Sequence, residues 1–295
     1  MEALNELFKL SSAVYLIIIA AELILSYILN RHYYSTGGIV TNIYLSLMAL
    51  GLDAVLRVLI VGVLAFFYQF RPGEIHNVYL YWVALLFAED FMYYLLHVAD
   101  HYCRLFWAVH VTHHSSEEFN FTVGFRSSVF QPLYRFIYFI PLALCGFKPW
   151  DIMLIHSATQ IWAILAHTQL VGKLGPLEWF LVTPSNHRVH HASNPQYLDK
   201  NMGLVFIIWD RIFGTYEEEK ETAKFGLTEN IKTSNPVKVV FHEWVNMRRD
   251  VKNAPDLKSK LLYIFGQPGW SHDGKRKTSK QYYNEWLQEQ KMSSN

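Results

Sequence analysis

The sequence predicts an all-α integral membrane protein, with four to five transmembrane helices below a cytosolic helical cap. Three observations support this fold class. The 295 residues are 52% hydrophobic and 16% aromatic but only 17% charged, which is unusual for a soluble protein. Several apolar runs are long enough to cross a bilayer. Between and after these runs, histidines recur at helical spacing, and they indicate what the cap holds.

The first element is an apolar run at 13–29 without a cleavage-site pattern, which predicts a membrane anchor rather than a signal peptide. The next runs predict four more spans, and the last two are joined so closely that they should form a helical hairpin. A later run, 203–214, contains Asp210 and Arg211 and is too short to span, so it should lie at the interface or pack under the site. The predicted spans after the anchor are 44–70, 78–96, 129–147 and 151–170.

This pattern divides the chain into three segments. Residues 1–75 are expected to form N-terminal transmembrane helices, 76–216 a domain that carries the histidine motifs, and 217–295 a cytosolic C-terminal helical tail rich in Lys and Arg. If the basic tail is cytosolic, alternation of the spans places every histidine cluster at the cytosolic face, in a bacterial inner membrane or the endoplasmic reticulum. The net charge of +1 gives no indication of a nucleic-acid partner.

Three short motifs concentrate the histidines: "HVADH" at 97–101, "HVTHH" at 110–114 and "HRVHH" at 187–191. Residues four apart share a helix face, whereas adjacent residues diverge by about 100°. Each of the last two motifs therefore offers imidazoles in two directions, which suits two adjacent metals. His167 lies at the end of the fifth predicted span and adds a ninth ligand. The predicted ligands are His97, His101, His110, His113, His114, His167, His187, His190 and His191.

The donor set predicts which metal binds. Imidazole suits several transition metals, and a site without cysteine but with open positions favours iron over structural zinc. We therefore expect two iron ions, with zinc as an alternative in purified samples. The competing interpretation is that individual histidines cap helices or lie at the interface, which does not account for so many at this spacing.

Other polar residues inside the predicted spans suggest supporting roles. Asp90 lies two turns before His97 and should orient a ligand imidazole through a hydrogen bond. His156 cannot join the same compact site, because eleven residues of helix place it roughly 16 Å from His167. We interpret His156, Gln160 and Ala163 as the wall of a substrate cavity, although a core histidine bonded to a neighbouring helix explains His156 equally well. Asp53 and Arg57 should form an internal salt bridge.

The three motifs, in this order and with these separations, resemble the fatty acid hydroxylase/sterol desaturase superfamily. The segments "HHSSEEFNFTVGFR" (113–126), "TPSNHRVHH" (183–191) and "YLDKNMGLVFIIWDRIFGTY" (197–216) look similar to its alkylglycerol monooxygenase-like branch. The resemblance implies a membrane helix core under a cytosolic metal cap. It also implies a non-haem di-iron enzyme that uses O₂ to hydroxylate a C–H bond of a lipid substrate.

Electrons for such chemistry must come from outside the chain, because the sequence shows neither a dinucleotide-binding fingerprint nor a haem-attachment motif. The candidate donors are tetrahydrobiopterin or another reduced pterin, a cytochrome and a ferredoxin. Two alternatives remain open. The same site could serve a lipid or sterol desaturase, or the chain could be a non-catalytic metal-binding membrane scaffold.

Overall fold

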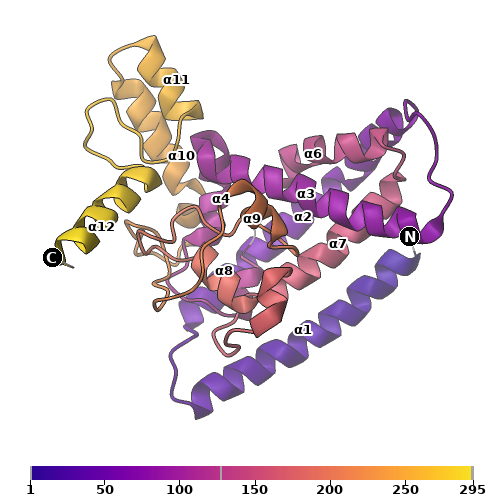
Figure 1. Cartoon of the computed structure of the whole chain (residues 1–295), viewed down its shortest axis with the longest axis horizontal. Coiled ribbons are helices and arrows are strands. Elements are labelled where there is room, and N and C mark those ends of the chain that lie inside the picture. The colour runs from indigo at the N-terminus through magenta and orange to yellow at the C-terminus, as the bar shows by residue number, and fades with distance from the viewer. Residues whose placement is uncertain (1, 127, 294–295) are drawn as a thin grey trace.

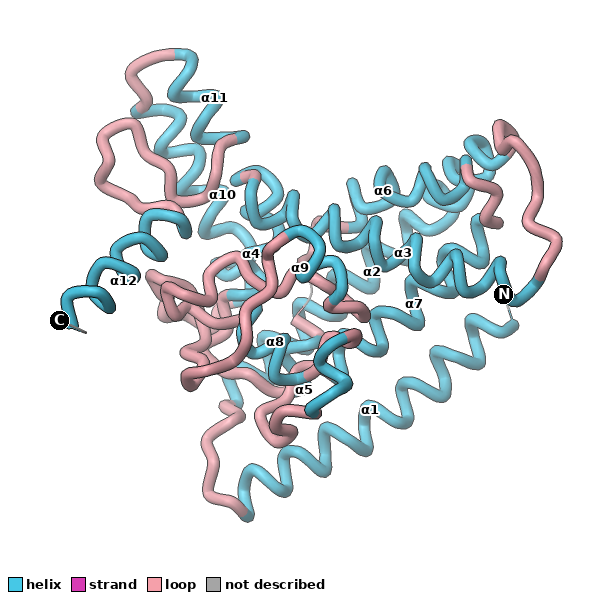
Figure 2. Tube along the Cα trace, in the orientation of Figure 1, coloured by secondary structure: helices cyan, strands magenta, loops and turns pink. Residues whose placement is uncertain are grey.

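The computed structural model describes residues 2–126 and 128–293, with side chains from Tyr15 onward. Met1 and residues 294–295, the outer ends of the predicted segments 1–75 and 217–295, lie outside this description. The described residues form helices and loops without a β-strand, apart from two isolated bridges (Figure 2). Five helices make up a bundle: α1 (Glu2–Ile28), α2 (Thr36–Tyr68), α3 (Val78–Tyr102), α6 (Pro132–Leu144) and α7 (Pro149–Leu165).

Short-range signals set the ends of the bundle helices. The side chains of Ser35 and Asn77 cap α2 and α3 by accepting hydrogen bonds from Gly38 and Leu80 backbone N–H groups. Proline occupies the first turn of both α6 and α7, where its missing N–H costs nothing. The short connection between α6 and α7 produces the predicted hairpin. Apolar residues from four helices then form the main core, namely Ile60, Leu64, Leu85, Phe139 and Ile152.

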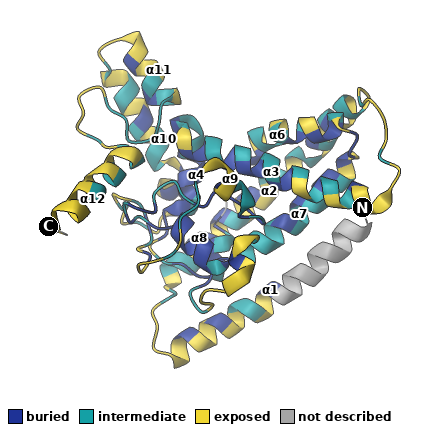
Figure 3. Ribbon diagram, in the orientation of Figure 1, coloured by how far each residue is buried: buried dark blue, intermediate teal, exposed yellow. Residues whose placement is uncertain are grey.

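Two bundle helices, α2 and α3, are long and apolar enough to cross a membrane. The apolar window of α2 has a mean hydropathy of 2.3, yet only 17% of it is buried. Val58, for example, is 83% exposed. An apolar helix with so much exposed surface is typical of a lipid-facing span rather than a soluble core (Figure 3).

The helix lengths bear on the predicted number of spans. The apolar run at 129–147 yields an α-helix of only 13 residues, α6, which is about 20 Å long and shorter than a bilayer core of about 30 Å. Helix α7 has 17 residues, at the lower limit for spanning. A membrane protein with at least two apolar spans fits these lengths, while four to five spans and the cytosolic placement of the cap stay predictions.

The remaining elements gather at one end of the bundle, where α3 and α7 end and α2 and α6 begin (Figure 1). They include α4 (Arg104–His114), α5 (Phe121–Gly124), a 3-10 helix (Gly175–Trp179), α8 (Pro184–His190) and α9 (Ile208–Phe213). The C-terminal helices are α10 (Pro236–Asn253), α11 (Leu257–Phe265) and α12 (Ser279–Ser293). Buried Arg104 fastens α10 to α4 through ion pairs of 2.7 Å to both Glu243 and Asp250. The C-terminal tail is therefore folded onto the histidine-bearing segment.

Candidate metal centre

Four segments bring the nine histidines to the cap end of the bundle. His97 and His101 lie on the last turns of α3, and "HVTHH" forms the last turns of α4. His167 follows directly after α7, and "HRVHH" forms α8 and its C-terminal cap. All but His113 are buried, and His113 is partly buried. The histidines thus converge from segments up to 94 positions apart, as the numbering of the first and last of them, His97 and His191, shows.

The imidazoles separate into two compact groups. One ring nitrogen from each member of a group lies within 4.8 Å of those of all the other members. Adjacent histidines fall into different groups, because their side chains diverge around the helix: His113 and His114 are split in this way, as are His190 and His191. The first group is His97, His101, His110, His114 and His190, and the second is His113, His167, His187 and His191.

Backbone carbonyls fix the outer nitrogen of four of these rings. The Nδ1 atoms of His97 and His167 lie 2.8 Å from the carbonyl oxygens of Met202 and Ala163, respectively. Those of His113 and His190 lie 3.0 Å from the carbonyl oxygens of Arg126 and Lys200. A carbonyl can only accept, so in each ring Nδ1 carries the proton and Nε2 presents a lone pair to the interior of its group.

The inner nitrogens then meet in a way that hydrogen bonding cannot explain. The Nε2 atoms of His113 and His167 are 3.3 Å apart, and both are unprotonated because both Nδ1 atoms donate to carbonyls. Nε2 of His187 lies 2.9 Å from Nε2 of His167, and Nδ1 of His187 is buried without a partner. Lone pairs that face one another this closely repel unless a cation lies among them. The donor set therefore fits two transition-metal ions, one per group.

Burial also keeps the imidazoles in the form that binds metals. Loss of solvent lowers the pKa of His113 to about 4, and it holds the pKa of His110, His114 and His167 well below the ordinary value. The same effect lowers the pKa of the three histidines of "HRVHH". Neutral imidazole is the metal-binding form, so no proton has to be displaced from these rings at neutral pH.

The predicted role of Asp90 is wrong. Its carboxylate accepts hydrogen bonds from the backbone N–H groups of Val205 and Phe206 and from the Trp209 indole, so it fastens the loop before α9 to α3 and contacts no histidine. Two other carboxylates lie beside the rings. Asp199 Oδ1 is 3.1 Å from His101 Nδ1, and Asp100 Oδ2 is 3.7 Å from His110 Nδ1. Asp100 sits beside His101 in the first motif, whereas nothing in the local sequence identifies Asp199.

A cavity of about 320 Å³ lies inside the bundle, and we call it the bundle cavity. His156, Gln160 and Ala163 of α7 all line it, next to apolar side chains such as Leu50 and Met153. His156 also bonds to Glu89 of α3 at 2.8 Å, so both interpretations of this histidine describe part of its environment. Besides His156, five of the candidate ligands line the bundle cavity: His97, His110, His113, His167 and His187.

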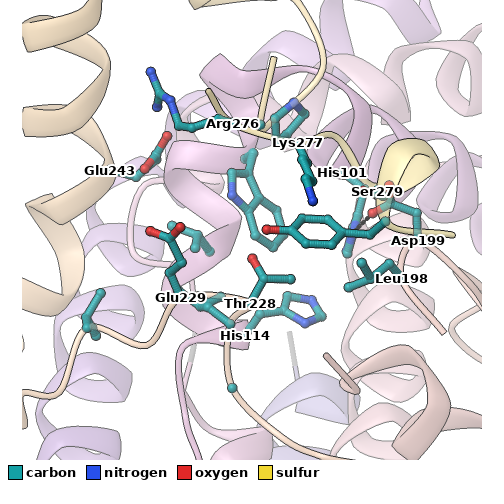
Figure 4. Close-up of a pocket in the computed structure, with 18 of the residues that line it drawn as sticks. His101, His114, Leu198, Asp199, Thr228, Glu229, Glu243, Arg276, Lys277 and Ser279 are labelled. Atoms are coloured by element: carbon teal, nitrogen blue, oxygen red, sulfur yellow. Dashed lines mark hydrogen bonds and ion pairs between the residues drawn. The ribbon is translucent and has the colours of Figure 1, made fainter. Parts of the chain in front are cut away.

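A second cavity of about 300 Å³, which we call the cap cavity, lies on the other side of the histidines. Figure 4 shows Leu198 and Asp199 at one side of it, Glu229 and Glu243 at the other, and Arg276 and Lys277 above. Trp107 also lines it, and its ring centroid is 5.2 Å from that of His101. The remaining four ligand candidates line this cavity: His101, His114, His190 and His191.

Comparison with known proteins shows what the segment that carries this centre is similar to. Residues 82–215, which contain all nine histidines, match the model of the fatty acid hydroxylase family. Over 190 residues the chain is 41% identical to alkylglycerol monooxygenase of Homo sapiens, an alignment that covers 64% of this chain and 42% of that protein. It is 28% identical over 155 residues to the ornithine lipid hydroxylase OlsE of Rhizobium tropici, which covers 52% of this chain and 46% of that one.

A desaturase is also similar. The Delta(7)-sterol 5(6)-desaturase erg32 of Schizosaccharomyces pombe is 27% identical over 150 residues, which cover 48% of this chain and 41% of the desaturase. The aligned part of the chain spans about two fifths of the length of the human alkylglycerol monooxygenase. No solved structure matches the chain. The family resemblance predicted from the histidine motifs is confirmed.

Proposed function

We propose that the chain is a membrane-bound non-haem di-iron monooxygenase that hydroxylates a lipid C–H bond, since residues 82–215 match the model of the fatty acid hydroxylase family. The observation that carries the proposal is the position of the two histidine groups, which form the wall of a largely apolar cavity inside a membrane bundle. The higher identity to a monooxygenase than to a desaturase supports hydroxylation as the reaction.

The first histidine group would hold one iron and the second group the other. Bound iron would supply the reduction of O₂ that drives oxidation of the C–H bond. Nitrogen ligands without a thiolate suit iron, and four or five imidazoles per ion leave room in the coordination sphere for small molecules. The Nδ1–carbonyl hydrogen bonds keep four of the nine rings in place, so that these ligands are oriented before the metal binds.

The bundle cavity would receive the lipid. Its walls come from α2, α3, α6 and α7, so an alkyl chain can enter from the bilayer without passing through water. Leu50, Met153 and Ile164 would pack against methylene groups, and they exclude water from the side of the histidines that faces the substrate. In this arrangement the chain's own residues bind and orient the substrate.

The cap cavity would receive the electron donor. Hydroxylation consumes one O₂, two electrons and two protons from outside, and yields an alcohol and one water. A volume of about 300 Å³ admits a small heterocycle such as tetrahydrobiopterin, whereas a cytochrome or ferredoxin would dock on the outer surface. Both Trp107 and His101 line this cavity with their ring centroids 5.2 Å apart, so a donor bound here would lie beside a candidate ligand.

The decisive experiment is turnover under ¹⁸O₂. Iron-loaded protein in nanodiscs receives an alkyl lipid and a chemical reductant, and the products are analysed by mass spectrometry. We expect an alcohol that carries one ¹⁸O. A new double bond without label would instead support the desaturase, and iron binding without O₂ consumption with any lipid or donor would support a non-catalytic scaffold.

The orientation of the site needs a separate test. We propose that the cap faces the cytosol of a bacterial inner membrane or of the endoplasmic reticulum. In a variant whose two native cysteines are replaced by serine, Lys275→Cys introduces a thiol at a position whose side chain is 82% exposed. An impermeant maleimide should label it only after the membrane is opened, and labelling of intact cells would reverse the orientation.

A further inference from the structure

The bundle cavity has a charged floor inside an otherwise apolar wall. Asp53 of α2 pairs with two arginines, through 2.9 Å from Oδ2 to Arg57 and 2.8 Å from Oδ1 to Arg135 of α6. All three side chains line the cavity. The sequence predicts only the Asp53–Arg57 pair, because Arg135 lies 82 positions from Asp53 and meets it through the packing of α6 on α2.

This floor has more hydrogen-bond donor groups than anionic acceptor groups. Both Asp53 oxygens are occupied, so that among the described lining residues two guanidinium groups face one carboxylate. The amide nitrogen of Gln160 is also buried in the wall without a hydrogen-bond partner of normal geometry. Glu89 and Asp100 lie nearby but do not line the cavity: Glu89 bonds to His156, and Asp100 accepts from Gln131 and Tyr134. The described lining of the floor therefore has one anionic acceptor, Asp53, against two guanidinium groups and the Gln160 amide.

The floor lies close to the histidines. Arg135 is one helical turn, or about 6 Å of rise, after Gln131 on α6. The Gln131 amide donates to Asp100 at 2.8 Å, and Asp100 in turn lies 3.7 Å from His110. The head group of a ligand bound at Arg135 would thus place its nearby alkyl carbons close to the first histidine group.

An alkyl chain alone does not suit this floor, since it would cover a guanidinium and an amide donor without offering them an acceptor, which is costly at membrane depth. We propose that the bundle cavity binds an amphiphile through an anionic head group, which docks on Arg135 and Gln160 and fixes the carbon presented to the histidines. This inference rests on the proposed function, because it assumes that the lipid substrate occupies this cavity. A carboxylate and a phosphate monoester share the required chemistry.

Photocrosslinking tests the inference without turnover. Iron-loaded protein in phosphatidylcholine nanodiscs is exposed to four probes with a twelve-carbon chain and a terminal diazirine: dodecanoate, dodecyl phosphate, dodecanol and dodecyltrimethylammonium. The readout is the yield of labelled α2 and α7 peptides. Charge-assisted hydrogen bonds predict that the better anion labels about tenfold more than the alcohol, with the cation lowest. The anion that labels more identifies the head group.

Matched variants assign the effect to the floor. Arg135→Gln should reduce anion labelling to the level of the alcohol, Arg135→Lys should retain the preference for anions, and Gln160→Leu should reduce labelling by both anion and alcohol. Arg249→Gln on α10 removes the same charge from the cap and should change nothing. Iron content shows whether each variant is folded.

The outcomes separate the two proposals. Equal labelling of the cavity by all four probes, or a preference for the cation, overturns the anionic head group but leaves a lipid in the bundle cavity. If no probe labels α2 or α7, the lipid-binding role of the cavity fails, and the inference fails with it.

Discussion

The two cavities on either side of the histidines differ in almost every respect except their shared wall. The bundle cavity is enclosed by long helices and is largely apolar above its charged floor, whereas loops and C-terminal residues with charged side chains enclose the cap cavity. No candidate ligand lines both cavities, yet each histidine group contributes to both, since His97 and His101 of the first group face opposite sides. Each metal position can therefore be approached from two chemically different compartments.

This difference also shows how the two compartments are built. The bundle cavity comes from α2, α3, α6 and α7, whose sequences alone indicate apolar helices. The cap cavity joins Trp107 of α4 to loop residues such as Gly226 and Pro268, and to Tyr282 of α12. The bundle cavity thus depends on helix packing, and the cap cavity depends on chain segments that come together only in the folded protein.

The largest effect is expected when a candidate ligand is removed from the histidine wall that the two cavities share. His114→Ala removes a ligand from the first group and His191→Ala removes one from the second, so each should lower bound iron from two ions to about one per chain. Lipid hydroxylation should fall by more than about 100-fold, since even indirect contacts of metal ligands cost 10- to 100-fold when removed. Elemental analysis and product formation provide the measurements. His32→Ala, at an exposed histidine, is the control, and two irons in either ligand variant would contradict the two-group assignment.

Blocking the bundle cavity should affect the lipid alone. Ala163→Phe adds a ring to the cavity wall, while the Ala163 carbonyl that holds His167 remains. We expect hydroxylation of long-chain lipids to fall by more than about tenfold, because the added volume displaces the chain. Iron content and the rate of reduction by a small donor should be unchanged. Normal turnover of long lipids would show that the substrate lies elsewhere.

Filling the cap cavity should produce the opposite result. Thr228→Trp places an indole at the exposed edge of this cavity without touching a ligand. We expect the KM for a small electron donor to rise by up to about tenfold, with lipid binding and iron content preserved. Steady-state kinetics at varied donor concentration measure the change. A rise in the KM for the lipid instead would reverse the assignment of the two cavities.

The smallest effect is expected at the hydrogen bond to His101. Asp199→Asn removes the charge but keeps an oxygen that can accept from Nδ1, which now lies 3.1 Å from the carboxylate. The affinity of the first group for iron should fall by less than about tenfold, below the range for complete loss of such a contact. Competition with a chelator measures it. A loss beyond 100-fold would mean that Asp199 acts as more than an orienting group.

The sequence predicts the histidine centre well because helical geometry is local. The split of His113 from His114 follows from the angle between adjacent residues on one helix, and it needs no knowledge of the fold. The prediction that Asp90 orients a ligand imidazole fails for the opposite reason. Its partners, Val205, Phe206 and Trp209, arrive from a loop about 115 positions away, and no periodicity reveals that contact.

Long-range packing also explains the other residues that the sequence does not identify. Asp199 reaches His101 across 98 positions, and Arg135 reaches Asp53 across 82. Apolar runs likewise overestimate helix length, because part of the run at 129–147 forms turns on either side of α6. Spacing along the chain thus predicts the candidate ligands, while their surroundings depend on tertiary contacts.

The use of backbone carbonyls to hold the histidines has a consequence for mutational tolerance. Four rings rely on carbonyl oxygens of Arg126, Ala163, Lys200 and Met202, and every amino acid supplies such an oxygen. Substitution at Ala163, Lys200 or Met202 therefore leaves this acceptor in place and the ring proton on Nδ1, provided that the local backbone is maintained. Arg126 is more constrained, because its buried guanidinium also donates to Thr112, Asn42 and Ser115. The orientation of these candidate ligands is thus independent of the size and polarity of three residues beside them, so that a lineage can reshape the surroundings of the histidine groups without rebuilding the groups.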